Sequence, residues 1–258
     1  MTYGSAMAAG YDRGRGLRSR DLGRWMAAAI PYLPSAGGRI LDLGAGAGRF
    51  SDALARSCGA SVVACEPSAA MRAALRSNLP DASVVGGEAE AIPFLAGVFD
   101  AVWASQVVHH VKDLPAFAAD LRHVLRPQGH LLIRGGFGPV KDLLLYRYFP
   151  HAWAARSAVR LTLELIAGVL AGAGFAMVDH VQVEQTFAQN AEELVKKVEA
   201  RSLSPLAGLP GQAFEHGLSA LRSDADNGAF AGPIVDRLDL VVFRAHHQAP
   251  AGEQDPFA

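Results

Sequence analysis

The chain has 258 residues, half of them hydrophobic, and a formal net charge of −1 at pH 7. This length and apolar content predict one large α/β domain with a well-buried core, and they exclude a chain that is disordered throughout. The lack of a basic excess argues against a general nucleic-acid-binding surface, and two cysteines are too few for a disulfide framework.

The N-terminal region predicts neither a secretory signal nor a membrane anchor. Its arginines lead into no long apolar segment, so we expect a soluble cytoplasmic protein with no membrane partner. Residues 22–33 have the spacing of an amphipathic helix, which Pro31 and Pro34 should end. The long apolar run at 161–178 is broken by Gly172-Ala173-Gly174, which predicts a helix end and a new strand rather than a membrane span.

A short apolar strand at residues 40–43 runs directly into three alternate glycines, Gly44, Gly46 and Gly48. Glycine has no Cβ, so the chain can turn tightly and a ligand can reach the first N–H groups of the next helix. The dinucleotide pattern Gly-x-Gly-x-x-Gly would need a glycine where this chain has Arg49. The turn therefore predicts a nucleotide-like ligand, with a nicotinamide cofactor as the less favoured alternative.

The second strand, residues 61–65, is followed by Glu66, Pro67 and Ser68. A carboxylate roughly 20 residues after the glycines can accept hydrogen bonds from both hydroxyls of a ribose. The alternative is a surface glutamate at a strand end, and the preceding glycine turn favours the ribose. Ser68 is suited to cap the next helix, which Met71 continues.

The third and fourth strands, residues 82–85 and 99–104, bring further polar residues to the same end of the sheet. Ligands of open α/β sheets bind where the strand order reverses, which we expect between the first and fourth strands. The segment after the fourth strand, residues 105–111, should therefore face the glycine turn.

The second half of the chain continues the alternation of helices and strands. We expect helices at 114–125 and 161–171, and strands at 130–134, 175–183 and 238–243. Two stretches do not fit this sheet, the aromatic-rich residues 135–156 and the mostly helical residues 187–236. They connect elements near one edge, so we expect them to form a lid over a substrate, with ordinary packing on the core as the alternative for any one aromatic residue.

Taken in order, four motifs resemble those of the class I S-adenosylmethionine (SAM) methyltransferases, of the type often called methyltransferase type 11. They are Asp42-x-Gly-x-Gly-x-Gly, Glu66, the run Glu88-Ala89-Glu90-Ala91-Ile92-Pro93-Phe94, and the short turn with His110. The resemblance implies a Rossmann-like, seven-stranded, mostly parallel sheet with helices on both faces and a helical, aromatic lid. The chain departs from the family pattern at Glu88, where Asp is commoner, and at Gln128, where the family has glycine.

The resemblance also implies how the cofactor is held. Tyr11 would place its ring near the sulfonium, and Arg13 or Arg15 would pair with the cofactor carboxylate. Backbone carbonyls near Ala104 or Ser105 would take the ammonium, and the acidic segment at 88–90 would address adenine. The cofactor-binding residues implied in this way are Tyr11, Arg15, Asp42, Gly44, Ala45, Gly46, Gly48, Glu66, Pro67, Met71, Glu88, Ala89, Glu90, Ser105 and Gln106.

Methyl transfer from SAM is an in-line displacement at a carbon bonded to S⁺, so the protein mainly aligns the reactants and excludes water. A hydroxyl or acidic C–H acceptor also needs a base, and His109 and His110 are the histidines expected in the crevice. The alternative is that His110 braces the loop and His109 points to solvent. The other histidines are scattered, so we predict no metal site.

The sequence thus predicts a SAM-dependent methyltransferase that acts on a small molecule, by O- or C-methylation and in secondary metabolism, and releases S-adenosylhomocysteine. Methylation of nucleobases is disfavoured because residues 105–108 read Ser-Gln-Val-Val, not Asn-Pro-Pro-(Tyr/Phe). The alternatives are an NAD-dependent oxidoreductase, a non-catalytic SAM-binding partner and, less favoured, a methyltransferase of macromolecules.

The expected organisation divides the chain into seven segments. They are a cofactor-covering segment and helix (1–38), a SAM-binding core (39–135), a lid insertion (136–159), a return to the core (160–186), a helical lid insertion (187–236), the last core strand (237–245) and a disordered tail (246–258).

Overall fold

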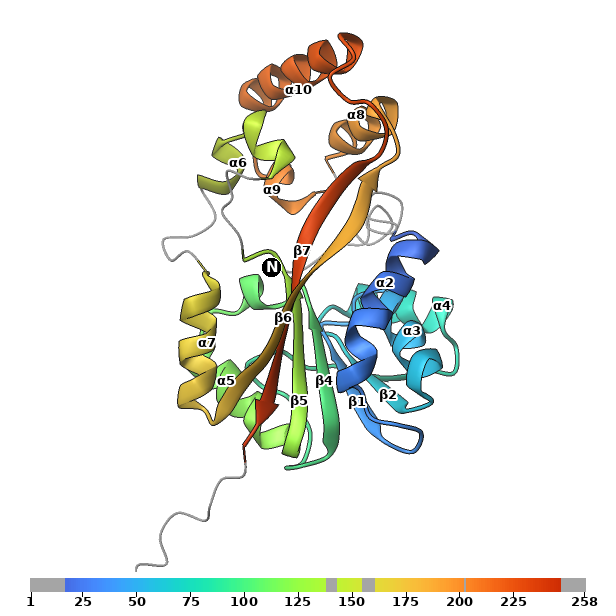
Figure 1. Ribbon diagram of the computed structural model, residues 1–258, viewed down its shortest axis with the longest axis vertical. Helices are drawn as coiled ribbons and strands as arrows, with labels where there is room; N and C mark the ends of the chain where they lie inside the picture. The colour runs from blue at the N-terminus through green and yellow to red at the C-terminus, as the bar shows by residue number, and fades with distance from the viewer. Residues whose placement is uncertain (1–16, 138–142, 155–160, 202, 247–258) are drawn as a thin grey trace, which may run out of the picture.

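The structure is a computed structural model that describes residues 17–137, 143–154, 161–201 and 203–246. Its centre is a seven-stranded sheet with the order β3-β2-β1-β4-β5-β7-β6 (Figure 1). The strands are β1 (Arg39–Leu43), β2 (Ser61–Cys65), β3 (Ser83–Val85), β4 (Phe99–Ser105), β5 (Leu125–Gly135), β6 (Phe175–Ala188) and β7 (Ile234–Ala245).

The pairing confirms the predicted Rossmann-like class. Strands β1 to β5 are parallel, and β1 lies between β2 and β4, so the strand order reverses at β1 and β4 as expected. Strand β7 is antiparallel to both β5 and β6. Because the carboxyl ends of parallel strands meet at one edge, the residues after β1, β2 and β4 are brought to that edge.

Helices cover both faces of the sheet, as the amphipathic spacing of their sequences requires. Helices α2 (Ser19–Ala29) and α3 (Arg49–Cys58) pack on one face, around Trp25, Phe50 and Trp103. Helices α5 (Leu114–Val124) and α7 (Leu163–Gly172) pack on the other, where the buried residues include Phe117 and Ile166. Helix α4 (Ala69–Asn78) follows β2, and the side chain of Ser68 accepts a hydrogen bond from the backbone N–H of Met71, as its predicted capping role requires.

The two stretches that did not fit the sheet pack against each other. They form the 3-10 turn η4 (Leu144–Arg147) and the helices α6 (His151–Ala154), α8 (Ala191–Glu199), α9 (Ser204–Ala207) and α10 (Gly211–Asp226). Their buried apolar side chains make a separate hydrophobic core, which we call the helical cluster. In Figure 1 this cluster stands beyond the end of the sheet toward which the parallel strands run.

Strands β6 and β7 are longer than the sequence analysis expected. They continue to pair with each other above the last pairing of β5, from Val183 opposite Leu238 to Ala188 opposite Ile234. We call this two-stranded extension the arm; it carries the helical cluster above the sheet (Figure 1). Just beyond the expected strand bounds, Glu184 and Arg237 form a cross-strand ion pair at 3.1 Å.

Two local details also differ from expectation. Helix α2 begins at Ser19 and ends at Ala29, and the chain continues as a 3-10 turn (Ile30–Tyr32) that contains Pro31. The expected turn before the fifth strand lies inside β5, where the register with β4 shifts and Gln128 adopts a left-handed φ of 67°. An irregularity in the pairing thus accommodates the turn.

Candidate functional site

The turn after β1 depends on its glycines. Gly44, Gly46 and Gly48 have φ angles of 68°, 58° and 88°, in the left-handed region that side chains disfavour. A Cβ on Gly44 would lie 2.6 Å from Cγ2 of Val107. The turn after β1 is therefore packed tightly against the segment after β4, at the point where the strand order reverses.

The carboxylate of Glu66 is fixed beside this turn. Its Oε2 accepts a hydrogen bond from the backbone N–H of Gly46 and its Oε1 one from the N–H of Ser68, both at 2.9 Å. The N–H groups of Gly44 and Ala45 donate to the carbonyl of Cys65 at 2.8 and 3.1 Å. These bonds connect the end of β2 to the glycine turn and set the orientation of the carboxylate.

Asp42 lies beneath the turn. It is 1% exposed, and its Oδ2 accepts a hydrogen bond of 2.6 Å from the Ser51 hydroxyl on α3. Burial raises the pKa of Asp42 to about 7; the bond from Ser51 opposes this shift and the nearby charge of Glu66 adds to it. In the structure Asp42 therefore ties β1 to α3, which supports the turn from below.

The segment after β3 folds back on itself. Glu88 and Ala91 form an isolated antiparallel bridge, and a Cβ on Gly87 would lie 2.6 Å from Pro93. Glu88 is exposed and Ala89 half-buried, whereas Oε1 of Glu90 accepts hydrogen bonds from the N–H groups of Lys112 and Asp113, at 2.5 and 2.7 Å. Glu90 thus holds this segment against the start of α5, a role that the sequence analysis did not anticipate.

The segment after β4 contains both histidines. Gln106 has a left-handed φ of 58°, and its N–H donates to the carbonyl of Arg134 at 2.8 Å. His109 and His110 end the 3-10 turn η2 (Val108–His110), and their ring centroids are 4.0 Å apart. Both side chains are exposed, so the structure places two imidazoles at the carboxyl end of β4.

A buried cation that no sequence motif singled out, Arg134, lies next to this segment. The guanidinium of Arg134, at the end of β5, donates to Oγ of Ser105 at 3.1 Å and to Oε1 of Gln185 at 2.5 Å. It lies over the rings of Trp25 and Phe50, with its central carbon 4.5 and 5.3 Å from their centroids. An arginine directly after the apolar run Leu131-Leu132-Ile133 was the available signal.

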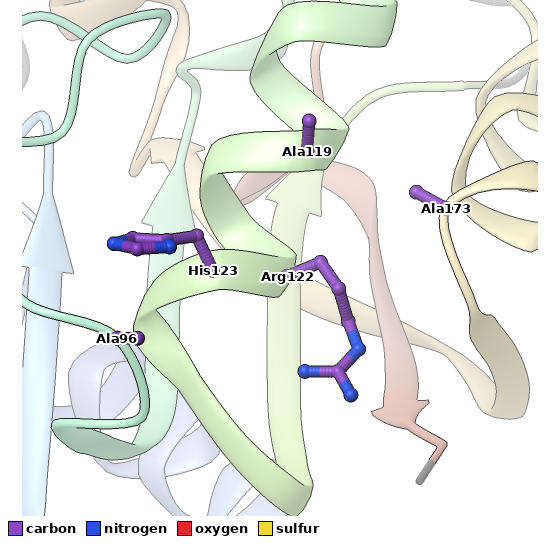
Figure 2. A pocket seen from close by; sticks show the side chains of 5 residues that line it. All are labelled: Ala96, Ala119, Arg122, His123 and Ala173. Carbon is purple, nitrogen blue, oxygen red and sulfur yellow. The ribbon is translucent and has the colours of Figure 1, made fainter. Parts of the chain in front are cut away.

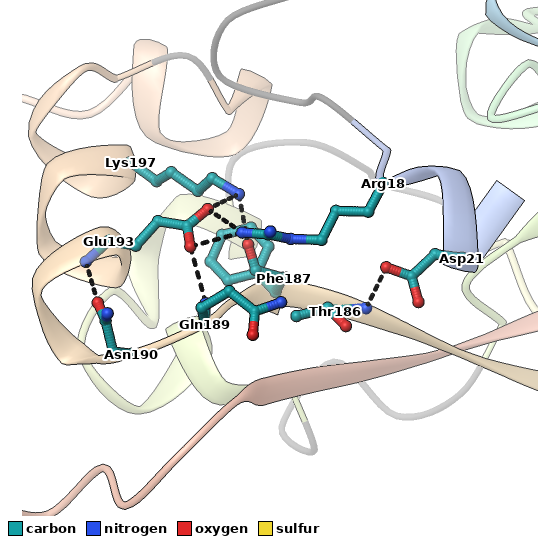
Figure 3. A network of polar contacts seen from close by, with 8 residues as sticks. All are labelled: Arg18, Asp21, Thr186, Phe187, Gln189, Asn190, Glu193 and Lys197. Carbon is teal, nitrogen blue, oxygen red and sulfur yellow. Dashed lines mark hydrogen bonds and ion pairs between the residues drawn. The ribbon is translucent and has the colours of Figure 1, made fainter.

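A polar network joins α2 to the helical cluster (Figure 3). Arg18 pairs with Glu193 of α8 at 2.9 Å, and the same carboxylate pairs with Lys197 at 3.0 Å. Below it, the buried carboxylate of Asp21 accepts a hydrogen bond from the N–H of Thr186 in the arm, at 3.1 Å. The helix that follows the N-terminal segment is thus held to both the arm and α8.

The remaining predicted site residues fall into two groups. Met71 is buried in α4, and the carbonyl of Pro67 accepts a hydrogen bond from Arg72 at 2.9 Å. Tyr11, Arg13 and Arg15 lie outside the described residues, as does the predicted tail from residue 247 onward.

A hollow of about 390 Å³ lies elsewhere on the molecule (Figure 2). It is lined by Ala96, Ala119, Arg122, His123 and Ala173. Ala96 precedes β4 and His123 is near the end of α5, so this hollow lies at the amino ends of β4 and β5, away from the glycine turn. Figure 2 shows Arg122 and His123 on opposite sides of α5.

Two features are absent from the described ranges. No three His, Cys, Asp or Glu side chains there come together in a way that could hold a metal ion. No described helix combines the length and the apolar character that crossing a membrane requires.

Part of the chain is similar in sequence to known methyltransferases. Residues 41–133 match the family model described as a methyltransferase domain. An uncharacterized methyltransferase of Mycobacterium bovis is 37% identical over 131 residues, which are 51% of this chain and 50% of that protein. A demethylmenaquinone methyltransferase of Beutenbergia cavernae is 36% identical over 125 residues, 48% of this chain and 52% of that protein. The chain thus spans about half the length of the curated relatives it matches.

Among solved structures, one similar fold is a putative methyltransferase from an antibiotic biosynthesis pathway of Anabaena variabilis. Its TM-score is 0.68 at 24% identity, and the match covers 85% of this chain and 96% of that one. This likeness shows the fold alone. The family match is more specific, because it runs from β1 to β5 and contains the glycine turn, Glu66 and both histidines of η2. Residues 41–133 of this chain are therefore similar to a methyltransferase domain.

Proposed function

We propose that the chain binds SAM in the crevice between β1 and β4 and transfers its methyl group to a small molecule. The acceptor lies, in this proposal, between the crevice and the helical cluster, which acts as a lid. The methylated atom is a hydroxyl oxygen or an activated carbon, and the second product is S-adenosylhomocysteine.

The observation that carries the proposal is the fixed carboxylate of Glu66 beside the glycine turn. A carboxylate offers about four lone-pair positions, and backbone N–H groups use one on each oxygen. The others remain for the two hydroxyls of a ribose. Because both oxygens are already oriented by the backbone, binding a nucleoside here costs little ordering of the side chain.

The rest of the cofactor is assigned by position. Exposed Glu88 and the adjacent Ala89 are proposed to address the adenine, since they follow β3 beside β2. Ser105 and Gln106 are proposed to hold the methionine end, because their segment packs against Gly44 through Val107. Tyr11 and Arg15 remain proposed contacts from the N-terminal segment.

The base is proposed to be His109 or His110. Both rings are exposed at the carboxyl end of β4, on the side of the sheet toward which the helical cluster lies. An imidazole can accept a proton from a hydroxyl near neutral pH, which is the step that such an acceptor requires. Transfer itself needs alignment and exclusion of water, which the helical cluster would supply.

Two comparisons support a small acceptor. One relative is named as a demethylmenaquinone methyltransferase, and a structural neighbour is described as part of an antibiotic biosynthesis pathway. The latter also supports secondary metabolism as the setting. The segment Ser105-Gln106 in place of Asn-Pro speaks against a nucleobase acceptor.

The test is a calorimetric titration of the purified, folded protein with S-adenosylhomocysteine, and with NADH as control. We expect binding in the micromolar range for S-adenosylhomocysteine and none for NADH. NADH binding alone would replace the proposal with an oxidoreductase. A screen for acceptors that gain a methyl group follows, and retained cofactor binding without turnover of any acceptor would favour a non-catalytic partner protein.

A further inference from the structure

Arg134 is a buried cation with an unusual set of contacts. It is 7% exposed, and its guanidinium makes hydrogen bonds to the side chains of Ser105 and Gln185 while it lies over the rings of Trp25 and Phe50. Taking a guanidinium out of water is costly unless its donors are used. The contacts that offset this cost come from residues distant in the sequence.

Each contact leads to a different part of the proposed site. Ser105 ends β4, and Phe50 is in the first turn of α3, directly after the glycine turn. Trp25 belongs to α2, and Gln185 belongs to the arm that carries the helical cluster. The indole N–H of Trp25 also donates to Oε1 of Gln185, at 3.3 Å, so the arm and α2 meet at this guanidinium.

The main chain of Arg134 adds a further bond to the same segment. Its carbonyl accepts the N–H of Gln106, a residue held at a left-handed φ of 58° without being glycine. Such a conformation costs free energy and persists only where the surroundings fix it. Arg134 thus holds one residue of the segment by its side chain and the next by its backbone.

The side-chain chemistry is specific to arginine. A planar guanidinium can lie flat on aromatic rings while its fork donates in two directions. Lysine has the same charge, but it is a point charge on a flexible stem and cannot make both the stacked contact and the two hydrogen bonds.

We propose that Arg134 is a positioning residue for methyl transfer, which fixes Ser105 at the methionine end of the cofactor site and couples it to α2 and the arm. This inference rests on the proposed function, because it assumes that SAM occupies the crevice beside Ser105. It adds a residue that no cofactor motif of the chain contains.

The test uses two ligands that differ at one end. S-adenosylhomocysteine has the amino-acid end of the cofactor, whereas 5′-methylthioadenosine keeps the nucleoside and lacks that end. We expect Arg134→Lys to bind S-adenosylhomocysteine about tenfold more weakly, because the loss of one well-placed hydrogen bond to the cofactor costs affinity of this order. The affinity for 5′-methylthioadenosine should stay within about twofold, since the nucleoside contacts are elsewhere. Arg126→Lys, at the other end of β5 and paired with Asp100, is the matched control and should bind both ligands like the wild type.

A double-mutant cycle with Ser105→Ala tests the route of the effect. If Arg134 acts through Ser105, Arg134→Lys should lower the affinity for S-adenosylhomocysteine by less than about threefold when it is made in the Ser105→Ala variant. Thermal unfolding without ligand shows whether each variant is folded. Unchanged affinity of Arg134→Lys for S-adenosylhomocysteine would overturn the inference. An equal loss of affinity for both ligands would also overturn it, because that result indicates general disruption. So would an undiminished effect of the Lys substitution in the Ser105→Ala variant. A wild-type protein that binds neither ligand would overturn the proposed function and this inference together.

Discussion

The carboxylate of Glu66, at the end of β2, accepts a hydrogen bond of 2.9 Å from the backbone N–H of Gly46, which lies 20 residues earlier in the turn after β1. The bond makes the side chain that would bind ribose depend on the conformation of the turn that would bind the methionine end. A change at either residue should therefore be felt across the whole cofactor crevice.

Replacing Glu66 by glutamine should weaken binding of S-adenosylhomocysteine by at least tenfold. The amide keeps the shape of the carboxylate, but one of its two positions becomes an NH₂ group that faces a backbone donor, Gly46 or Ser68. That unpaired donor lowers the stability of the fold with or without ligand. Affinity falls because the ribose hydroxyls lose a charged acceptor; a hydrogen bond to a charged group is worth about 1.5–3 kcal/mol, and 1.4 kcal/mol is tenfold in affinity. Calorimetry measures the effect, with Glu192→Gln on the exposed surface of α8 as control. Unchanged affinity would remove Glu66 from the ribose site.

Gly44→Ala should destabilise the protein by about 2 kcal/mol or more. A left-handed φ costs an L-residue about 1–2 kcal/mol, and the added Cβ would lie 2.6 Å from Val107, which must move. Urea unfolding measures the loss, and Val107→Ala in the same chain should recover the part caused by the clash. Gly23→Ala is the control and should stabilise the protein. That glycine lies within α2 with open space around it, and alanine favours a helix by about 0.5–1 kcal/mol relative to glycine. Equal effects at both glycines would contradict the role given to the turn.

The sequence predicted the fold class and the point at which the strand order reverses, because these follow from local patterns. Strands bounded by glycine and proline, and amphipathic helices between them, are encoded by neighbouring residues. The glycine turn and Glu66 could be identified because a ribose-binding carboxylate follows at a roughly regular distance.

The parts that the sequence did not predict depend on contacts between distant residues. The predicted sixth strand stopped at Val183, because the extension through Glu184 and Gln185 depends on pairing with β7. Asp42 and Glu90 carry acidic side chains that fit a ligand site, yet Ser51 and the backbone before α5 bind them in the fold. Arg134 was not singled out because its partners lie on other elements, distant in the sequence.

Asp42 should make the stability of the protein depend on pH. Its pKa is raised by burial from the ordinary value of 3.8 to about 7 in the folded protein, so the folded state holds a proton that the unfolded state releases. Its contribution is therefore most favourable below about pH 4 and is lost as the pH rises through about 7, on the order of a few kcal/mol in total. Asp42→Asn should remove this dependence. The measurement is the difference in free energy of unfolding between wild type and variant from pH 4 to pH 8.

The comparison of wild type with Asp42→Asn is needed because Asp236 also has a pKa raised by burial, to about 6. Subtracting the variant cancels that second titration. Ser51→Ala should shift the loss of stability to higher pH, since the hydroxyl stabilises the ionised form of Asp42. A constant difference between wild type and Asp42→Asn across the range would contradict the raised pKa.

His109→Ala and His110→Ala should separate catalysis from cofactor binding. If one imidazole takes the acceptor proton, its loss should lower turnover about 100-fold or more, the usual contribution of a positioned base. The affinity for S-adenosylhomocysteine should change little, because neither ring is in the proposed nucleoside or methionine contacts. Single-turnover assays with the acceptor found by screening measure the first effect and calorimetry the second. Full turnover in both variants would end the histidine-base hypothesis.

Gly217→Ala should loosen the helical cluster while the sheet stays folded. A Cβ at this buried position in α10 would lie 2.5 Å from the ring of Phe149 and 2.5 Å from the carbonyl of Tyr148, so α10 must move away from η4 and α6. Because the helical cluster has its own hydrophobic core and joins the sheet mainly through the arm and α2, the strain should be released within the helical cluster.

Hydrogen exchange should show loss of protection in α8 and α10 with β1 to β5 unchanged. Affinity for S-adenosylhomocysteine should stay within about twofold, and turnover should fall, since a lid acts on the acceptor. Gly168→Ala in α7, where open space surrounds the glycine, is the control. Loss of protection in β1 to β5 along with the helices would show that the cluster and the sheet unfold as one unit, and the lid would then have no independent motion.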